Sequence, residues 1–231
     1  MDEREGKHIE VITDLLTYLN SKTDKYVLKG ETALRICYGL DRSSYNIDLD
    51  GKGDKIFSIV DEFCKICNYS YTILKNTNIV KIFEIHYDEN DLLRIEVSGQ
   101  MSHINYAQFK KINGIIVYDL DSLTSMKCVD YGSKDKITDF YDILFICNNY
   151  YDKLSKQSKN QIFYTLSYKG IEQYDYLVHS QPKDESINNK RLLDMFLKAI
   201  NKIGMLTDEE DKKNIELYKS ECESELIPRK F

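Results

Sequence analysis

The sequence lacks any apolar run of about 18 residues, the length that a membrane-spanning helix requires. Its first ten residues, MDEREGKHIE, are mostly charged and contain no apolar core of the kind that a secretory signal carries. Together these two absences predict a cytoplasmic protein that has no membrane partner.

Basic residues are also fewer than acidic ones. The chain has 32 Lys and Arg against 38 Asp and Glu, so its formal net charge is −6. This balance excludes a generic binder of polyanions, because affinity for phosphate depends on clustered basic side chains. One local exception contains Lys153, Lys156, Lys159 and Lys169 among the aromatic residues of 150–168. This stretch is either a nucleic-acid surface or a solvated helix face over a tyrosine-containing core.

Proline is nearly absent, with two residues in the chain, and no Pro- or Gly-rich linker, repeat or low-complexity segment is visible. At 231 residues the chain is long enough for one large domain or two small ones. The six cysteines are expected to be free thiols in a cytosolic protein. Cys64 and Cys67 have a suggestive spacing, but neither a second cysteine pair nor a nearby histidine pair completes a zinc site.

The most informative stretch runs from residue 26 to residue 53. Its first apolar run, 26–28, predicts a buried strand, and Lys29-Gly30 end it before a helix expected over 32–40. A glycine at a helix N-terminus lets backbone N–H groups approach a phosphate, and the helix dipole favours the anion. The pattern therefore predicts a phosphate-binding turn, with ordinary turn chemistry as the alternative.

A second strand, expected over 45–50, carries a row of polar side chains. Because side chains alternate along a strand, Asn46, Asp48 and Asp50 share one face. Carboxylates two residues apart point the same way, and Mg²⁺ takes one or two carboxylates together with phosphate oxygens. A phosphate position beside a metal position is the layout that phosphoryl or nucleotidyl transfer needs. The alternative is a surface strand that happens to end in Asp-x-Asp.

The remaining patterns predict an α/β half followed by a helical half. We expect helices over 4–21 and from Asp54 to 67, an antiparallel meander over 69–74, 79–87 and 92–98, a short strand over 115–118, and helices from Asp119 onward. These patterns predict two domains, residues 1–118 and residues 119–231. The class is α+β, a mixed or antiparallel sheet flanked by helices and followed by a helical bundle that completes the cleft.

The segments Lys29-Gly30-Glu31-Thr32-Ala33-Leu34, Arg42, and Ser44-x-Asn46-Ile47-Asp48 form a motif. It resembles the opening motif of the AbiEii/AbiGii-type nucleotidyltransferase toxins, which belong to the DNA polymerase β-like nucleotidyltransferase superfamily. The resemblance implies a nucleotide-binding site and a metal site. The residues that it implies for nucleotide binding are Gly30, Thr32, Arg42, Ser44 and Lys127. Those that it implies for metal binding are Asn46, Asp48, Asp50 and Glu96, and Asp48 would also be catalytic.

Two positions depart from the family pattern. Glu31 stands where the family has a second Gly or Ser, and Asn46 stands where it has the first Asp of the metal pair. A carboxylate about 5 Å from a phosphate costs roughly 3 kcal/mol at an effective dielectric constant of about 20. Asp50 stands two residues after Asp48, so Asp48-Leu49-Asp50 restores an Asp-x-Asp pair on the same face. Glu96, on a neighbouring strand, is the expected third carboxylate, and an exposed strand glutamate is the alternative.

A second motif lies in the helical half. Lys127 precedes Asp139 and Asp142, which are one helical turn apart and can face the same side. The resemblance implies that Lys127 neutralises a triphosphate, Asp139 positions or deprotonates the attacking hydroxyl, and Asp142 supports the site. Thr138 stands where the family has an Arg. The alternatives are helix capping for Asp139 and a solvated side chain for Lys127.

These observations predict transfer of a nucleoside monophosphate from an NTP, with Mg²⁺ or Mn²⁺. The acceptor would be an RNA hydroxyl, such as a tRNA 3′ end, or a protein hydroxyl. The resemblance implies a toxin with a separately encoded antitoxin. Because of Glu31 and Asn46, a second reading stays open: a degenerate enzyme that binds nucleotide, RNA or a protein partner without catalysis. A third is a plain interaction module without nucleotide affinity.

Overall fold

The computed structural model describes residues 3–53, 55–99, 108–169, 172–181 and 187–205. The chain divides into two compact units, Met1–Met126 and Lys127–Phe231, and the division falls within helix α4 (Leu120–Lys134). Each unit is described by itself. Asp54, expected to cap a helix, and the helix expected over 207–221 lie outside the described residues.

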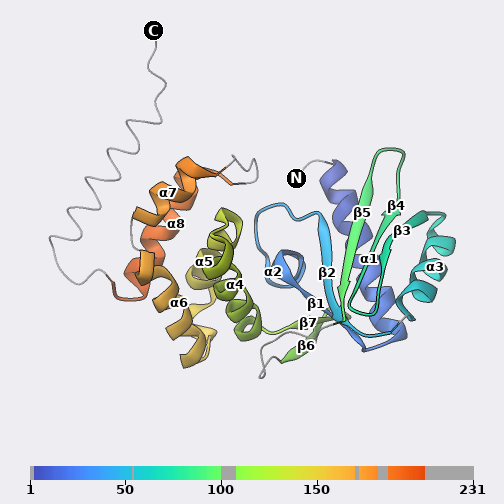
Figure 1. Ribbon diagram of the computed structural model, residues 1–231, viewed down its shortest axis with the longest axis horizontal. Coiled ribbons are helices and arrows are strands. Elements are labelled where there is room, and N and C mark those ends of the chain that lie inside the picture. Colours follow the sequence, from blue (N-terminus) through green and yellow to red (C-terminus); the bar gives the residue numbers. More distant parts are fainter. Residues whose placement is uncertain (1–2, 54, 100–107, 170–171, 182–186, 206–231) are drawn as a thin grey trace, which may run out of the picture. The chain divides into compact units, whose positions relative to one another are not determined.

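The described part of the first unit is built around a mixed sheet of seven strands (Figure 1). Its order is β3-β4-β5-β2-β1-β7-β6, with β2–β5 and β1–β7 parallel and the other pairs antiparallel. The strands are β1 (Tyr26–Lys29), β2 (Asn46–Gly51), β3 (Ser70–Asn76), β4 (Val80–His86), β5 (Leu92–Ser98), β6 (Phe109–Ile112) and β7 (Ile115–Tyr118). The expected meander is confirmed as β3–β5. The sequence did not predict β6, because its two central lysines hide any apolar alternation.

The two faces of this sheet differ in polarity. Alternate residues such as Ile47, Leu49 and Ile95 are buried on one face, which α1 (Glu3–Lys22) and α3 (Lys55–Cys67) cover (Figure 1). An edge contact between Phe57 of α3 and Phe83 of β4, with ring centroids 5.8 Å apart, belongs to this layer. The opposite face carries polar, half-exposed side chains such as Asp48 and Glu96. Helix α2 (Gly30–Tyr38) lies beside α1, and its Arg35 pairs with Glu5 of α1 at 2.7 Å.

The described part of the second unit is helical. Besides the end of α4 it contains α5 (Ile137–Tyr150), η1 (Tyr151–Lys153), α6 (Lys156–Lys169), α7 (Glu172–Ser180) and α8 (Asn189–Lys202). Aromatic rings form its core: Phe140 of α5 lies 5.4 Å from Tyr131 and 5.3 Å from Phe196, centroid to centroid. Tyr174 stacks on Phe196 at 6.5 Å. A mixed sheet followed by helices confirms the α+β class.

None of the helices in the described ranges is long and apolar enough to span a membrane.

Candidate functional site

The turn between β1 and α2 is tight because a glycine occupies it. Gly30 has φ +74°, a conformation that L side chains rarely adopt, and a Cβ there would lie 3.0 Å from Oδ2 of Asp48. Lys29, at the N-cap position of α2, makes no side-chain capping hydrogen bond. The first N–H groups of α2 are therefore not satisfied by their own cap residue, and a carboxylate lies beside them.

A pair of carboxylates lies on neighbouring strands next to this turn. Asp48 of β2 and Glu96 of β5 are direct partners in a parallel register, and both are half-buried. Adjacent strands are about 4.8 Å apart, so two carboxylates in register can share a cation. Asn46, at the start of the same row, is exposed, and its register partner is Arg94.

Asp50 belongs to the same row but is fully buried. Its Oδ1 lies 2.6 Å from Nζ of Lys29, and its Oδ2 accepts a hydrogen bond of 2.9 Å from the hydroxyl of Tyr118. Sequence reasoning did not anticipate these partners. In the structure Lys29 is the cross-strand partner of Asp48 and so shares the face of the acidic row. Asp50 is therefore already engaged within the fold.

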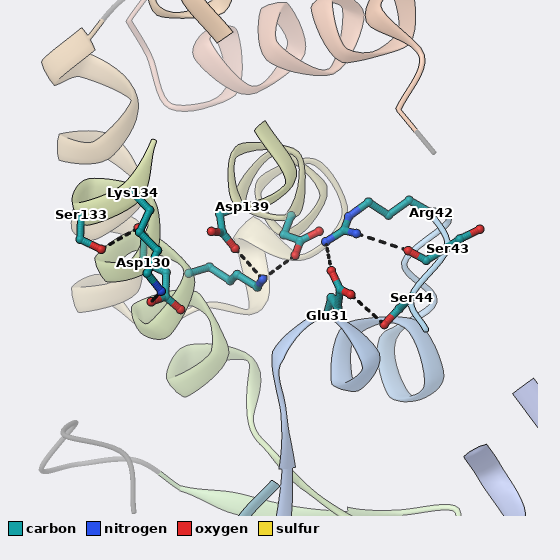
Figure 2. Close-up of polar contacts among 10 residues, drawn as sticks. Glu31, Arg42, Ser43, Ser44, Asp130, Ser133, Lys134 and Asp139 are labelled. Carbon is teal, nitrogen blue, oxygen red and sulfur yellow. Dashed lines mark hydrogen bonds and ion pairs between the residues drawn. The ribbon is translucent and has the colours of Figure 1, made fainter. Parts of the chain in front are cut away.

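Hydrogen bonds connect the predicted nucleotide-binding residues through Glu31. The Thr32 and Ser44 hydroxyls are 2.5 Å apart, and Thr32 also donates to the backbone oxygen of Asn46. Glu31 accepts from Arg42 at 2.7 Å and from Ser44 at 3.2 Å (Figure 2). The structure thus brings Thr32, Arg42 and Ser44 together, with the carboxylate of Glu31 among them.

The second unit holds a buried ionic cluster. Lys127 of α4 lies 2.8 Å from Oδ1 of Asp139 and 2.8 Å from Oδ2 of Asp142, both on α5. The side chain of Asp142 is fully buried, and those of Lys127 and Asp139 are each 10% exposed. The spacing of one helical turn therefore does place the two carboxylates on the same side, and both contact one ammonium group.

Two opposing influences act on the pKa of Lys127. Burial alone lowers this pKa, but the carboxylates of Asp142 and Asp139 outweigh it, and the result is a pKa above the ordinary 10.5. Lys127 is therefore a permanent cation at neutral pH. Its charge is compensated within the second unit, whereas the first unit holds Asp48 and Glu96 side by side.

The donor set in the first unit suits a hard divalent cation. No group of three or more His, Cys, Asp or Glu side chains arranged to hold a metal occurs in the part of the chain that the structure describes. Mg²⁺ does not need one, since one or two carboxylates suffice when phosphate oxygens and water complete its octahedron. Asp48 and Glu96 fit that requirement.

The same fold occurs in solved structures. JHP933 from Helicobacter pylori is 20% identical, with a TM-score of 0.67 and coverage of 98% of this chain and 97% of that one. A second H. pylori protein, described as a candidate nucleotidyltransferase, is 21% identical, with a TM-score of 0.69 and coverage of 96% and 99%. The nucleotidyltransferase toxin MenT4 from Mycobacterium tuberculosis is 12% identical, with a TM-score of 0.47 and coverage of 94% and 90%. The fold is that of the nucleotidyltransferases.

A family model gives the narrower assignment. The model of the nucleotidyl transferase AbiEii toxins, of type IV toxin–antitoxin systems, matches residues 14–196. The chain belongs to this family, which confirms the resemblance that its motifs indicated. No curated protein matches the chain.

Proposed function

We propose that this chain is a Mg²⁺-dependent nucleotidyltransferase that moves a nucleoside monophosphate from an NTP to an RNA hydroxyl. The observation that carries the proposal is the in-register pair of Asp48 and Glu96 beside the glycine turn that opens α2. The pair would hold the cation, and the uncapped start of α2 would receive phosphate oxygens. A bound Mg²⁺, or Mn²⁺, would neutralise charge that develops on the phosphates.

In the proposed reaction the acceptor oxygen attacks the α-phosphorus of the NTP. The new P–O bond forms as the bond between the α-phosphorus and its bridging oxygen breaks, and pyrophosphate leaves. The acceptor hydroxyl gives up its proton, for which Asp139 is the candidate that the sequence supplies. Lys127 is the candidate for neutralising phosphate charge. Because Lys127 already contacts two carboxylates, that role would exchange one anion for another.

The surface of η1 and α6 supports RNA over protein as the acceptor. Nζ of Lys153 lies 5.6 Å from the ring centroid of Tyr150, and Nζ of Lys159 lies 5.3 Å from that of Tyr151. Tyr164 is 69% exposed. Lysines and exposed rings within one short stretch of the chain suit a single strand, because bases stack on aromatic side chains while cations contact phosphates. The side chain of Lys169 lies outside the described residues.

The family assignment supports two further parts of the proposal. The protein would act as a toxin, and a separately encoded antitoxin would counteract it.

A second function, binding without catalysis, is favoured by Asn46 and Glu31. Asn46 offers a neutral oxygen where a carboxylate would bind Mg²⁺ more tightly, and Glu31 contacts the proposed phosphate-binding residues. The double variant Asn46→Asp/Glu31→Gly separates the two functions. Activity in the double variant alone would make the natural chain a binder.

The experiment for the main proposal is a transfer assay. Purified protein is incubated with each α-labelled NTP, with Mg²⁺ or Mn²⁺, and with total RNA or cell lysate. We expect label in RNA, lost in Asp48→Ala and retained in Asp61→Ala, which removes a carboxylate that is 44% exposed and paired with Lys65 on α3. Label in protein would show that the acceptor is a protein hydroxyl and not an RNA hydroxyl. Absence of label with every NTP would contradict the enzymatic proposal.

A further inference from the structure

A carboxylate already lies where the proposed phosphate-binding residues would receive an anion. Glu31 is the second residue of α2, and its two side-chain oxygens accept from different donors. Nη2 of Arg42 donates to Oε2, and Oγ of Ser44 donates to Oε1 (Figure 2). One internal anion therefore engages the guanidinium and the hydroxyl that the proposed function assigns to the nucleotide.

The donors are fixed, whereas the acceptor has room to leave. Arg42 is 4% exposed and Ser44 is 1% exposed, and the hydroxyl of Ser44 also lies 2.5 Å from that of Thr32. The side chain of Glu31, in contrast, is 29% exposed. Rotation of Glu31 toward solvent would therefore leave the guanidinium and the hydroxyl in position.

We propose that Glu31 is an internal competitor of the nucleotide's phosphate. Its carboxylate occupies the anion position between Arg42 and Ser44 in the resting protein, and an NTP must displace it to bind. This inference rests on the proposed function, because it assumes that the same two donors bind phosphate.

The exchange is physically reasonable for a buried guanidinium. A buried charge without a partner is costly, so Arg42 needs an anion at all times. Glu31 provides one before the nucleotide arrives, and a phosphate can replace it, since a guanidinium binds either group through paired N–H donors. The apparent affinity for a nucleotide is then the intrinsic affinity multiplied by the fraction of molecules in which Glu31 has left.

Competition of this kind also selects among ligands. A triphosphate carries more charge than a monophosphate and offers more oxygens to Arg42 and Ser44, so it displaces the carboxylate more effectively. Glu31 would thus act as a specificity-determining residue that favours the NTP over the nucleoside monophosphate.

The variant Glu31→Gln tests the proposal because it removes the charge and keeps the shape. Its amide oxygen can still accept a hydrogen bond, so the local fold is retained. We measure the Kd of each NTP, and of inorganic tripolyphosphate, by calorimetry without acceptor. We expect the Kd of the bound NTP to fall about tenfold. In the transfer assay KM for the NTP should fall while kcat is unchanged, because Glu31 does not touch the reacting atoms.

The chain offers a closely matched control in Glu5. Its Oε1 accepts from Nη2 of Arg35 at 2.7 Å and from Oγ of Ser43 at 2.8 Å, and its side chain is 24% exposed. Glu5→Gln therefore removes the same charge beside an arginine and a serine. Its serine partner, Ser43, directly precedes Ser44 in the chain. We expect its NTP Kd to stay within about twofold of the natural value.

Glu31→Asp serves if Glu31→Gln does not fold, which thermal unfolding would reveal. It keeps a charge near Arg42 but is one methylene shorter, so it cannot span both donors, and we expect a Kd about threefold lower. An unchanged or higher Kd in the folded Glu31 variants would overturn the inference, as would an equal gain in Glu5→Gln. If neither the natural chain nor any variant binds an NTP, the proposed function fails as well.

Discussion

Two pairs of acidic side chains in this molecule have opposite surroundings. Asp139 and Asp142 are buried in the second unit, and both contact the ammonium group of Lys127. Asp48 and Glu96, in the first unit, are half-exposed neighbours on parallel strands. The buried pair has its cation built into the chain. The pair on the sheet is the proposed site for a cation from solution.

The comparison teaches that spacing alone does not show whether an acid pair is neutralised within the chain. Both pairs have short, regular spacings in the sequence or in the sheet register, and both fall in motifs of the family. What differs is burial, because a buried carboxylate must be neutralised by a partner in the folded chain, whereas a half-exposed one can remain hydrated until a ligand arrives. The two pairs should therefore respond differently to substitution.

The largest effect is expected for Asp48→Ala. Loss of a proposed metal ligand removes several kcal/mol of transition-state stabilisation, so kcat/KM for transfer should fall about a thousandfold. The midpoint of thermal unfolding should change little, since Asp48 is half-exposed. Retained activity in Asp48→Ala would break the comparison, because the sheet pair would then not hold the cation that transfer needs.

Lys127→Met should lower stability as well as any transfer activity. It leaves two buried carboxylates without their cation, and the free energy of unfolding should fall by about 3–5 kcal/mol. Denaturant unfolding measures this loss. The matched control is Lys134→Met on the same helix, whose side chain is 55% exposed and pairs with Asp130 at 3.2 Å (Figure 2). An exposed pair of this kind contributes about 1 kcal/mol or less.

The pH dependence of the Lys127 cluster has a definite sign. Because folding raises the pKa of Lys127 above 10.5, its contribution is fully present below that pH and is lost as the pH rises through the folded-state pKa. The difference in unfolding free energy between the natural chain and Lys127→Met should therefore be constant from neutral pH to about pH 9. A difference that disappeared between pH 6 and pH 8 would contradict the assignment.

Glu96→Gln sharpens the comparison at the sheet. An amide oxygen is a weaker ligand for Mg²⁺ than a carboxylate, so the Mg²⁺ concentration for half-maximal transfer should rise about tenfold. Titration of Mg²⁺ at saturating NTP measures this. Glu89→Gln, in the exposed turn between β4 and β5, changes the same residue type away from the site and should leave the titration unchanged.

The smallest effect concerns the proposed RNA surface of the second unit. Tyr164→Ala removes an exposed ring, and the KM for RNA should rise about fivefold, within the range measured for loss of one stacked base. The KM for the NTP should not change. Tyr176→Ala, which removes a ring that is 55% exposed on α7, is the control. Equal effects of the two variants would remove the argument for this surface.

Much of the fold could be predicted because local patterns agree with the tertiary structure. Alternation along β2 and β5 predicted which side chains share a face. The family resemblance, and not the alternation, placed Glu96 on a strand beside Asp48, and the structure pairs the two residues. The helical stripe of α1 and the glycine between β1 and α2 were equally visible. β6 was missed because Lys110 and Lys111 interrupt its pattern.

The partners of the polar residues were harder to predict, because they depend on long-range contacts. The contact between Tyr118 and Asp50 joins residues 68 apart in the chain, and no local pattern encodes it. The same holds for Glu31, whose departure from the family motif was visible while its contacts with Arg42 and Ser44 were not. The sequence predicted candidate site residues, and the structure shows which of them contact one another.

The most direct test of the comparison is to locate the cation. Crystals grown with Mn²⁺ and a non-hydrolysable NTP analogue would be examined by anomalous scattering at the manganese edge. We expect one peak within coordination distance of both Asp48 and Glu96, and none beside Asp139 and Asp142, which already hold Lys127. A peak at the Lys127 cluster, or none at the sheet with the analogue bound, would contradict the account.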